Sequence, residues 1–411
     1  MKILFATGHG YLPQRVGGSE SSSHELILAL REQGHACAVL AQLQGNGWLA
    51  LRNRVLMKLR RQPLLADGLP GYPVQRAWFP DRHVEKAVAR EQPDVVLVQA
   101  GEPMKMARAF QATGVPTVVY LRDVEFHELG GDPAELPGLS YIANSNFVAE
   151  RFRAAFGPQP QVIRPLFRAE RYATPRAPKY VTFVNPHPVK GVDLAFEIAR
   201  LCPDIPFCFV EGWPMSREEK AALEARVAAQ INVHLEPRTH DMRQIYQATH
   251  TLLVPSQWEE AWGRVVTEAQ FSGIPVLASE RGGLPEAVGP GGRVLPHDAP
   301  AAAWAAVLRE YWRDRRAYGE ASGAALAHSR RPEIDPRQQL GKGIGFGQII
   351  IAAGAQPGHA IIDFSQRGKN KRRGHVALGA QRGDDGKSVA LRQHPVAHER
   401  VIGSGVGHRI A

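Results

Sequence analysis

Three glutamates in one apolar stretch are the residues of this sequence best suited to chemistry. The segment "PSQWEEAWGRVVTEAQFSGIPVLASERGGLPEAV" (255–288) contains Glu260, Glu268 and Glu286 among glycines and aliphatic residues. An unpaired carboxylate is costly to bury, so these groups lie on a wet face or are aimed at hydroxyls or cations.

Local patterns predict how these glutamates are positioned. "TLLVPS" is a predicted strand, so Glu260 falls in the loop at its carboxyl end, and Glu268 falls in a helix that begins near Arg264. Gly282 and Gly283 allow close backbone approach. Glu286 lies near the next helix N-terminus, where it is either a charge favoured by the helix dipole or a ligand group, and both interpretations stay open.

A lysine follows another predicted strand. In "YVTFVNPHPVKGVD" (180–193), Lys190 lies in a loop just before a helix N-terminus. Such a terminus is itself an anion site, so this loop is suited to binding an anion.

The order of elements predicts the fold class. Apolar β-branched runs alternate with helical patterns before residue 165, and the alternation restarts after a proline-containing connection at 165–180. We therefore expect an α/β protein with two doubly wound Rossmann-like domains, residues 1–165 and 175–330, facing across a cleft. Parallel sheets bind ligands at the carboxyl ends of their strands, so the cleft is the expected site.

The motif "EAWGRVVTE" followed by "SGIPVLASERGGLPE" resembles the signature of the retaining nucleotide-sugar glycosyltransferases of the GT-B fold, in particular glycosyltransferase family 4. The resemblance spans roughly residues 2–330. It implies that Glu260 contacts donor-sugar hydroxyls and organises the reacting centre. It also implies that Glu268 accepts hydrogen bonds from the ribose hydroxyls.

The resemblance extends to the rest of the donor site. Lys190 matches the family's phosphate-binding lysine, but Asn185 stands where the family usually has an arginine, so His187 or a backbone amide is an alternative partner for the phosphates. On the first-domain side, "RVGGSE" supplies a glycine loop of the kind that approaches the phosphates and the acceptor. The full donor-binding set expected from the resemblance is Gly17, Gly18, Asn185, Lys190, Gly263, Arg264, Val265, Glu268 and Gly283.

The catalytic set expected from the resemblance is Glu260 with Asp123 and His127. The last two lie in "YLRDVEFH", a region where a histidine or acidic residue often helps the reaction in the family. Arg122 is a further candidate there. A purely structural use of this polar cluster is the leading alternative for all three residues.

The implied reaction transfers a sugar from a nucleotide-diphosphate sugar to an acceptor hydroxyl with retention of anomeric configuration. No cofactor and no metal are expected, and the sequence lacks an Asp-x-Asp cation motif. The acceptor is a carbohydrate or a lipid-linked molecule, as in polysaccharide biosynthesis. The alternatives are another GT-B enzyme, such as a nucleotide-sugar epimerase or a phosphorylase, and a non-catalytic nucleotide-sugar-binding relative.

Charge is distributed unevenly along the chain. The formal net charge is +10, but residues 341–411 hold eleven Lys/Arg and four Asp/Glu, a net +7, which leaves +3 for the first 340 residues. This argues against a nucleic-acid partner for the globular part. The Gly/Arg/His-rich tail, 331–411, is expected to be unstructured, either as a basic arm or, as we favour, as a stretch translated from a shifted reading frame.

The distribution of apolar and basic residues also predicts where the protein is located and whether it contacts a membrane. No apolar run nears the length of a membrane span, so we expect a cytoplasmic protein. The basic amphipathic segment "LRNRVLMKLRRQP" (51–63) suggests peripheral contact with an anionic membrane at its inner face or with a lipid-linked acceptor, against the simpler alternative of a solvated surface helix. The three cysteines have no metal or redox spacing and are expected to be reduced core thiols.

Overall fold

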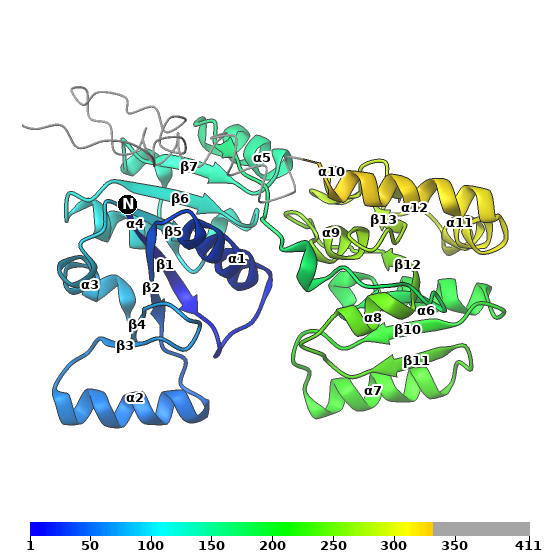
Figure 1. Ribbon diagram of the computed structural model, residues 1–411, viewed down its shortest axis with the longest axis horizontal. Helices are drawn as coiled ribbons and strands as arrows, with labels where there is room; N and C mark the ends of the chain where they lie inside the picture. The colour runs from blue at the N-terminus through cyan, green and yellow to red at the C-terminus, as the bar shows by residue number, and fades with distance from the viewer. Residues whose placement is uncertain (332–411) are drawn as a thin grey trace, which may run out of the picture. The chain divides into compact units, whose positions relative to one another are not determined.

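Two parallel sheets, each covered by helices, organise the chain in the computed structural model, which describes residues 1–331 (Figure 1). The predicted α/β class with two Rossmann-like sheets is confirmed. The predicted tail lies outside the described residues, apart from Arg331. Both sheets belong to one compact unit, and the predicted domain limits of 1–165 and 175–330 stay a prediction.

The first sheet has the strand order β3-β4-β2-β1-β5-β6-β7-β8. Its strands are β1 (Lys2–Gly10), β2 (Ala36–Gln42), β3 (Leu65–Asp67), β4 (Val74–Ala77), β5 (Val95–Gln99), β6 (Thr117–Leu121), β7 (Ser140–Ala143) and β8 (Gln161–Val162). Its helices are α1 (Gly18–Glu32), α2 (Gly47–Arg60), α3 (Val84–Glu91), α4 (Pro103–Gln111) and α5 (Asn146–Phe156), with 3-10 turns η1 (Pro80–His83), η2 (Phe126–Glu128) and η3 (Pro133–Glu135).

The second sheet has the order β11-β10-β9-β12-β13-β14. Its strands are β9 (Tyr180–Val184), β10 (Phe207–Val210), β11 (Val233–Glu236), β12 (Thr249–Val254), β13 (Val276–Ser279) and β14 (Gly292–Leu295). Its helices are α6 (Val192–Leu201), α7 (Arg217–Ala228), α8 (Arg243–Ala248), α9 (Arg264–Gln270), α10 (Leu284–Val288), α11 (Ala301–Arg313) and α12 (Arg315–Ser329); η5 (Pro188–Lys190) precedes α6, and η4 (Ala169–Arg171) lies between the sheets in sequence.

The two-residue period of a strand explains the two cores of the first sheet. Along β1, Leu4 and Ala6 join one buried cluster, while Ile3 and Phe5 join the cluster on the opposite face. All residues of β5 are buried, as expected for a central parallel strand covered on both faces. One departure from the parallel expectation is the edge pair β3–β4, which is antiparallel.

Side-chain caps fix where several helices begin. Ser145 is the N-cap of α5, and its hydroxyl accepts a hydrogen bond from the Val148 amide at 3.1 Å. Ser216 and Glu219 form a reciprocal capping box at α7. The three cysteines are free and buried, as predicted.

Candidate functional site

Lys190 and Glu260 form the centre of the candidate site. The Nζ atom of Lys190 lies 2.5 Å from Oε1 of Glu260, and the Ser256 hydroxyl donates to the same oxygen at 3.0 Å. The Lys190 ammonium also lies 5.1 Å from the centroid of the Trp213 ring. Strands β9, β10 and β12, which precede these loops, are neighbours in the sheet, so the loops meet at its carboxyl edge.

Backbone contacts hold the two loops together. The amides of Gln257 and Trp258 both donate to the carbonyl of Val189 at 2.9 Å. Gly191, the left-handed cap of α6, is packed so closely that a Cβ atom would collide with the carbonyl oxygen of Pro255. The close packing of the two loops, which positions the Lys190 side chain, therefore requires glycine at position 191.

Gly282 and Gly283 support the loop of Glu260 from the other side. The Gly283 amide donates to the carbonyl oxygen of Glu260 at 2.6 Å. A Cβ atom on Gly283 would lie 2.5 Å from the carbonyl oxygen of Ala261, and Gly282 has a φ of 60°. These glycines permit backbone contact with the Glu260 loop, which is the close approach that the sequence suggested.

Glu268 is buried inside a hydrogen-bond network. It is 8% exposed; Oε2 accepts from the Tyr246 hydroxyl at 2.9 Å, and Oε1 pairs with Nε of Arg264 at 3.2 Å. Burial raises the pKa of the Glu268 carboxyl, while Arg264 and Tyr246 oppose that rise. A carboxylate has about four lone-pair sites, so it retains acceptor capacity for further hydroxyls.

Arg264 connects α9 to the first sheet's α1. Its guanidinium donates to the Ser22 hydroxyl at 2.7 Å and lies 3.4 Å from the carboxylate of Glu25, which is fully buried. It also donates to Tyr172 Oη at 2.9 Å, and Tyr172 in turn donates to Glu25 at 2.6 Å. Burial lowers the pKa of Arg264, but Tyr172, Glu268 and Glu25 outweigh that effect and raise it.

The remaining predicted glycines have separate local roles. Gly17 is the N-cap of α1, and a Cβ there would lie 2.7 Å from Oε2 of Glu20. Gly18 begins that helix and faces Arg264, whose Cδ would be 3.6 Å from an added Cβ. Gly263 is the left-handed N-cap of α9, and Val265 packs at the edge of the second sheet's core.

Asn185 holds the loop after β10. Its backbone is left-handed, with a φ of 65°, and its side-chain oxygen accepts from the Trp213 amide at 2.9 Å. The rings of His187 and Trp213 pack edge to face with centroids 5.2 Å apart. Among the described residues, Nδ1 of His187 is buried without a hydrogen-bond partner.

The polar cluster after β6 divides into a buried and an exposed part. Arg122 stacks on Tyr120, with 3.7 Å between guanidinium carbon and ring centroid, and donates to Gln99 and Ser23. His127 is exposed, beside Glu128 at 3.9 Å.

Asp123, in the same cluster as Arg122 and His127, has a carboxyl group with a raised pKa. The residue keeps solvent contact, but protein packed around its carboxyl desolvates it and raises its pKa to about 6, with Glu125 and Glu128 adding to the rise. A carboxyl that titrates near neutral pH is suited to proton transfer. No contact joins Asp123 or His127 to the Lys190–Glu260 pair in the described structure.

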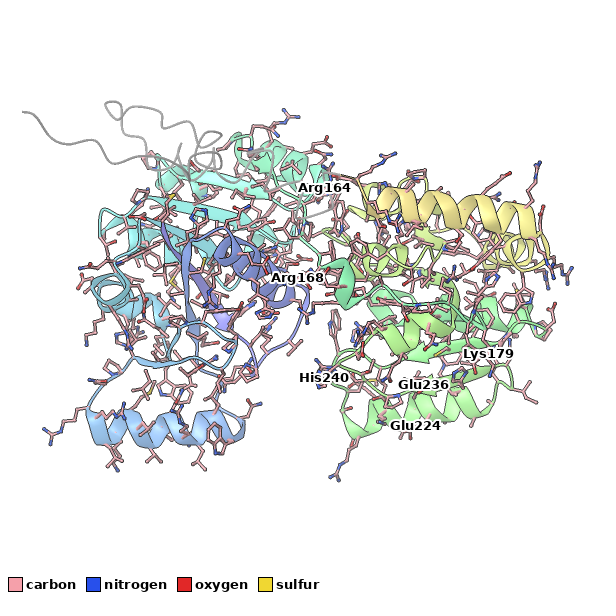
Figure 2. All side chains as sticks on the ribbon, in the orientation of Figure 1. Arg164, Arg168, Lys179, Glu224, Glu236 and His240 are labelled. Atoms are coloured by element: carbon pink, nitrogen blue, oxygen red, sulfur yellow. The ribbon has the colours of Figure 1, made fainter. Side chains whose placement is uncertain are left out.

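Glu286 contacts two residues near the end of the first sheet, Asn146 at the start of α5 and Arg164 after β8. Its carboxylate accepts from the backbone and side-chain amides of Asn146 at 2.9 and 3.1 Å, so it satisfies a donor at the start of α5. It also pairs with Arg164 at 2.6 Å. Arg164 and Arg168 belong to the segment between β8 and β9 (Figure 2).

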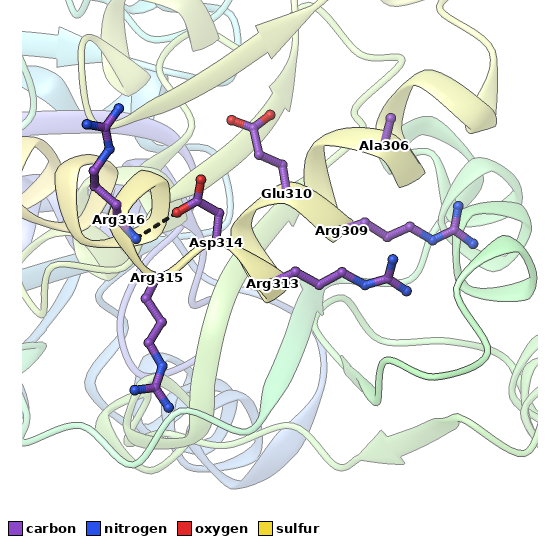
Figure 3. Close-up of a pocket in the computed structure, with 7 residues that line it drawn as sticks. All are labelled: Ala306, Arg309, Glu310, Arg313, Asp314, Arg315 and Arg316. Carbon is purple, nitrogen blue, oxygen red and sulfur yellow. Dashed lines mark hydrogen bonds between the residues drawn. The ribbon is translucent and has the colours of Figure 1, made fainter.

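One surface hollow of about 710 Å³ lies away from this site and is lined by residues of α11 and α12 and by Asp314 between them (Figure 3). Its Arg313 and Arg309 are engaged with Asp204 and the Leu201 carbonyl respectively, which makes them structural. Within residues 1–331 no group of three or more His, Cys, Asp and Glu side chains is arranged to hold a metal ion.

Several contributors to the site carry no motif in the sequence. Glu25, Tyr172 and Tyr246 surround Arg264 and Glu268 through contacts between distant parts of the chain. The one local signal is Glu25 itself, an acid beside Leu26 and Ile27 on the buried face of α1. Trp213 likewise belongs to no motif that marks it as a site residue.

Two family models match the chain in succession. The model described as Glycosyltransferase Family 4 matches residues 16–171, and the one described as Glycosyl transferases group 1 matches residues 169–324. D-inositol 3-phosphate glycosyltransferase of Mycolicibacterium gilvum is 32% identical over 155 residues, which are 36% of this chain and 35% of that protein. The chain thus matches about a third of the length of this curated relative.

Solved structures share the fold over nearly their whole length. Anabaena HepE, solved in complex with UDP-glucose, superposes with a TM-score of 0.63 and 18% identity over 83% of this chain and 98% of its own. WaaG, a glycosyltransferase involved in lipopolysaccharide biosynthesis, gives a TM-score of 0.59 and 16% identity over 84% of this chain and 100% of its own. Two matched family models and this fold place the chain in glycosyltransferase family 4, with the GT-B architecture.

Proposed function

We propose that the protein is a glycosyltransferase that moves a sugar from a nucleotide-diphosphate sugar to an acceptor hydroxyl, with retention of configuration and without a metal ion. The observation that carries the proposal is the Lys190–Glu260 pair at the carboxyl edge of the second sheet. It combines a cation suited to phosphate with an acceptor suited to sugar hydroxyls. Family membership and the UDP-glucose bound by HepE support a nucleotide-sugar donor.

The proposed donor site uses charge and helix geometry together. Lys190 lies directly before α6, whose N-terminal amides add to its positive potential, so a diphosphate there would be stabilised as negative charge develops on the leaving group. Trp213 and His187 border the same position. In this proposal Asn185 shapes the loop, and Lys190 with backbone amides takes the place of the arginine usual in the family.

The sugar and ribose are assigned to the two glutamates. Glu260 contacts Lys190 and Ser256. In the proposed complex, Lys190 pairs with the donor phosphate and the Glu260 carboxylate accepts hydrogen bonds from sugar hydroxyls. Glu268 is oriented by Tyr246 and Arg264 and offers its remaining lone pairs to the ribose. Asp123 is the proposed group for assisting proton transfer, because its pKa is raised to about 6; His127 stays a proposed second candidate.

The acceptor is proposed to be a carbohydrate or lipid-linked hydroxyl, with the enzyme in the cytoplasm, at the inner face of a membrane. The likeness to WaaG, which is involved in lipopolysaccharide biosynthesis, favours this class. Among residues 1–331 no helix is long and apolar enough to span a membrane.

The test is a binding and turnover panel. Uridine, guanosine, adenosine and thymidine diphosphate sugars would be titrated calorimetrically against wild type and Glu268→Ala, and donor hydrolysis would be measured in parallel. We expect selective binding of one nucleotide that weakens in the variant. Binding without any transfer or hydrolysis would instead support a non-catalytic relative, and release of an epimerised sugar would support a nucleotide-sugar epimerase.

A further inference from the structure

Helix α2 presents a stripe of large apolar side chains to solvent. Trp48, Leu51, Val55 and Leu59 are 67%, 63%, 50% and 74% exposed. Their spacing of three and four residues places them on one face of the helix. Single exposed apolar residues are ordinary, but a contiguous stripe marks an interaction surface.

The fold itself needs only the opposite face of this helix. Leu49, Ala50 and Asn53 are its buried residues, and α2 packs beside β3 at the edge of the first sheet (Figure 1). At 100° per residue these inward positions lie roughly opposite the exposed stripe. The stripe therefore contributes nothing to the core formed by the described residues.

Basic side chains flank the stripe on both sides. Arg52 lies on one side of the stripe, with its guanidinium 5.7 Å from the Trp48 ring centroid. Lys58 and Arg54 lie on the other side. No Asp or Glu occurs between Gly45 and Ala66. An apolar face bordered only by cations is typical of helices that lie in the interface of an anionic bilayer.

We propose that α2 docks the protein onto an anionic lipid surface, with the stripe in the acyl boundary and the flanking cations at the phosphates. Charge complementarity selects this occupant. A second copy of the chain would bring two cationic helices together, and residues 341–411, at net +7, would be repelled in the same way. This inference rests on the proposed location at the inner face of a membrane and names the surface responsible, and it is testable without turnover.

The experiment measures sedimentation of the full chain with vesicles of phosphatidylcholine, with and without phosphatidylglycerol. An apolar variant, Trp48→Ala with Leu59→Ala, keeps every charge, and a charge variant, Arg52→Gln with Lys58→Gln, keeps the stripe. All four positions are at the helix surface or partly exposed, so the fold should tolerate both changes. We expect wild type to require phosphatidylglycerol and each variant to bind about tenfold more weakly.

Matched controls separate this surface from others. Ile231→Ala removes an exposed apolar side chain elsewhere, and Arg315→Gln with Arg330→Gln removes two cations elsewhere; both should bind like wild type. Absence of wild-type binding would overturn the proposal, as would unchanged binding of the apolar variant. Sedimentation velocity that shows the apolar variant splitting a dimer would assign the stripe to a second copy instead.

Discussion

The ammonium of Lys190 and the carboxylate of Glu260 neutralise each other across 2.5 Å, although they come from loops after two different strands. The lysine of the candidate phosphate site is thus paired with the protein's own carboxylate. In the proposed reaction, the diphosphate of the donor would compete with Glu260 for this lysine.

Replacement of Lys190 tests this competition. We expect Lys190→Ala to weaken donor binding by about 10- to 100-fold, because a charge-assisted hydrogen bond is lost. Glu260→Gln removes the competing charge but also weakens the proposed acceptor for sugar hydroxyls, so donor affinity should stay near wild type while turnover falls by about a hundredfold or more. Calorimetry with steady-state kinetics separates the two effects. Lys220→Ala, which breaks a surface pair with Glu211, is the control; equal donor affinity in Lys190→Ala and wild type would contradict the assignment.

Gly283 offers a test of backbone packing. Gly283→Ala would place a Cβ 2.5 Å from the Ala261 carbonyl oxygen, so the Glu260 loop must shift. We expect turnover to fall at least about tenfold, because a small displacement of a reacting group is costly, together with a lower melting temperature. Gly323→Ala in α12 meets open space and should stabilise the protein by about 0.5–1 kcal/mol. Wild-type turnover in Gly283→Ala would show that the loop position is not critical.

Arg264 should be among the residues most important for stability. Arg264→Gln leaves Glu25 and Glu268 without their shared cation, and breaking a buried pair in this way costs about 3–5 kcal/mol. Urea denaturation measures the loss. Arg264→Lys should rescue little, because an ammonium lacks the planar fork that contacts Ser22, Tyr172 and Glu268 together. Arg313→Gln at the surface is the comparison, with an expected change within about 0.5 kcal/mol; a similar small change in Arg264→Gln would refute the network's role.

Acid sensitivity should arise partly from His250. Burial, with a contribution from Arg176, lowers its pKa to about 4, while its ring stacks on Tyr318. The pKa of His250 in the folded protein lies below the 6.5 of the unfolded chain, so the unfolded chain takes up the proton first as the pH falls. The contribution of neutral His250 to stability is therefore fully present above pH 6.5 and is lost as the pH falls toward 4.

His250→Phe keeps a ring in place but removes the titration. When the pH is lowered from about 7 to about 4.5, both proteins should lose stability. The free energy of unfolding of His250→Phe should fall by about 1–2 kcal/mol less than that of wild type, after allowance for the residual solvent contact of His250. Denaturant unfolding at both pH values measures the difference. Parallel losses in the two proteins would exclude His250 as a source of acid sensitivity.

Local periodicity was sufficient to predict much of the fold and the placement of the main candidates. Lys190 lies in the loop before α6, Glu260 in the loop after β12, and Glu268 in the helix that begins at Arg264, because each of these placements depends only on neighbouring residues. The short edge strand β14 and the helix α12 were not predicted. The apolar periodicity of both segments is weak, and they are stabilised by packing against neighbouring elements rather than by a pattern visible in their own sequences.

Partners across the chain could not be predicted. Glu25 and Arg264 are 239 residues apart, and no single-sequence pattern encodes such a contact. Similarly, nothing in "PVLASERGGLPE" indicates that Glu286 binds Asn146 and Arg164, which leaves its role as a helix charge or ligand group undecided from sequence. The role of Asn185 depends on the Trp213 amide, which only the folded loop brings near.

The contacts of Arg264 with residues of both halves of the chain limit how freely these halves can be exchanged with those of its relatives. A chimera that takes its first half from another family member would retain Arg264 and Glu268 but receive a foreign residue opposite them on α1. Unless that residue is again an acid, Arg264 would lose its pairing with Glu25 and keep only Glu268 as an anionic partner. A chimera should therefore carry Glu25, Tyr172 and Arg264 together, as one unit that spans the junction between the two halves.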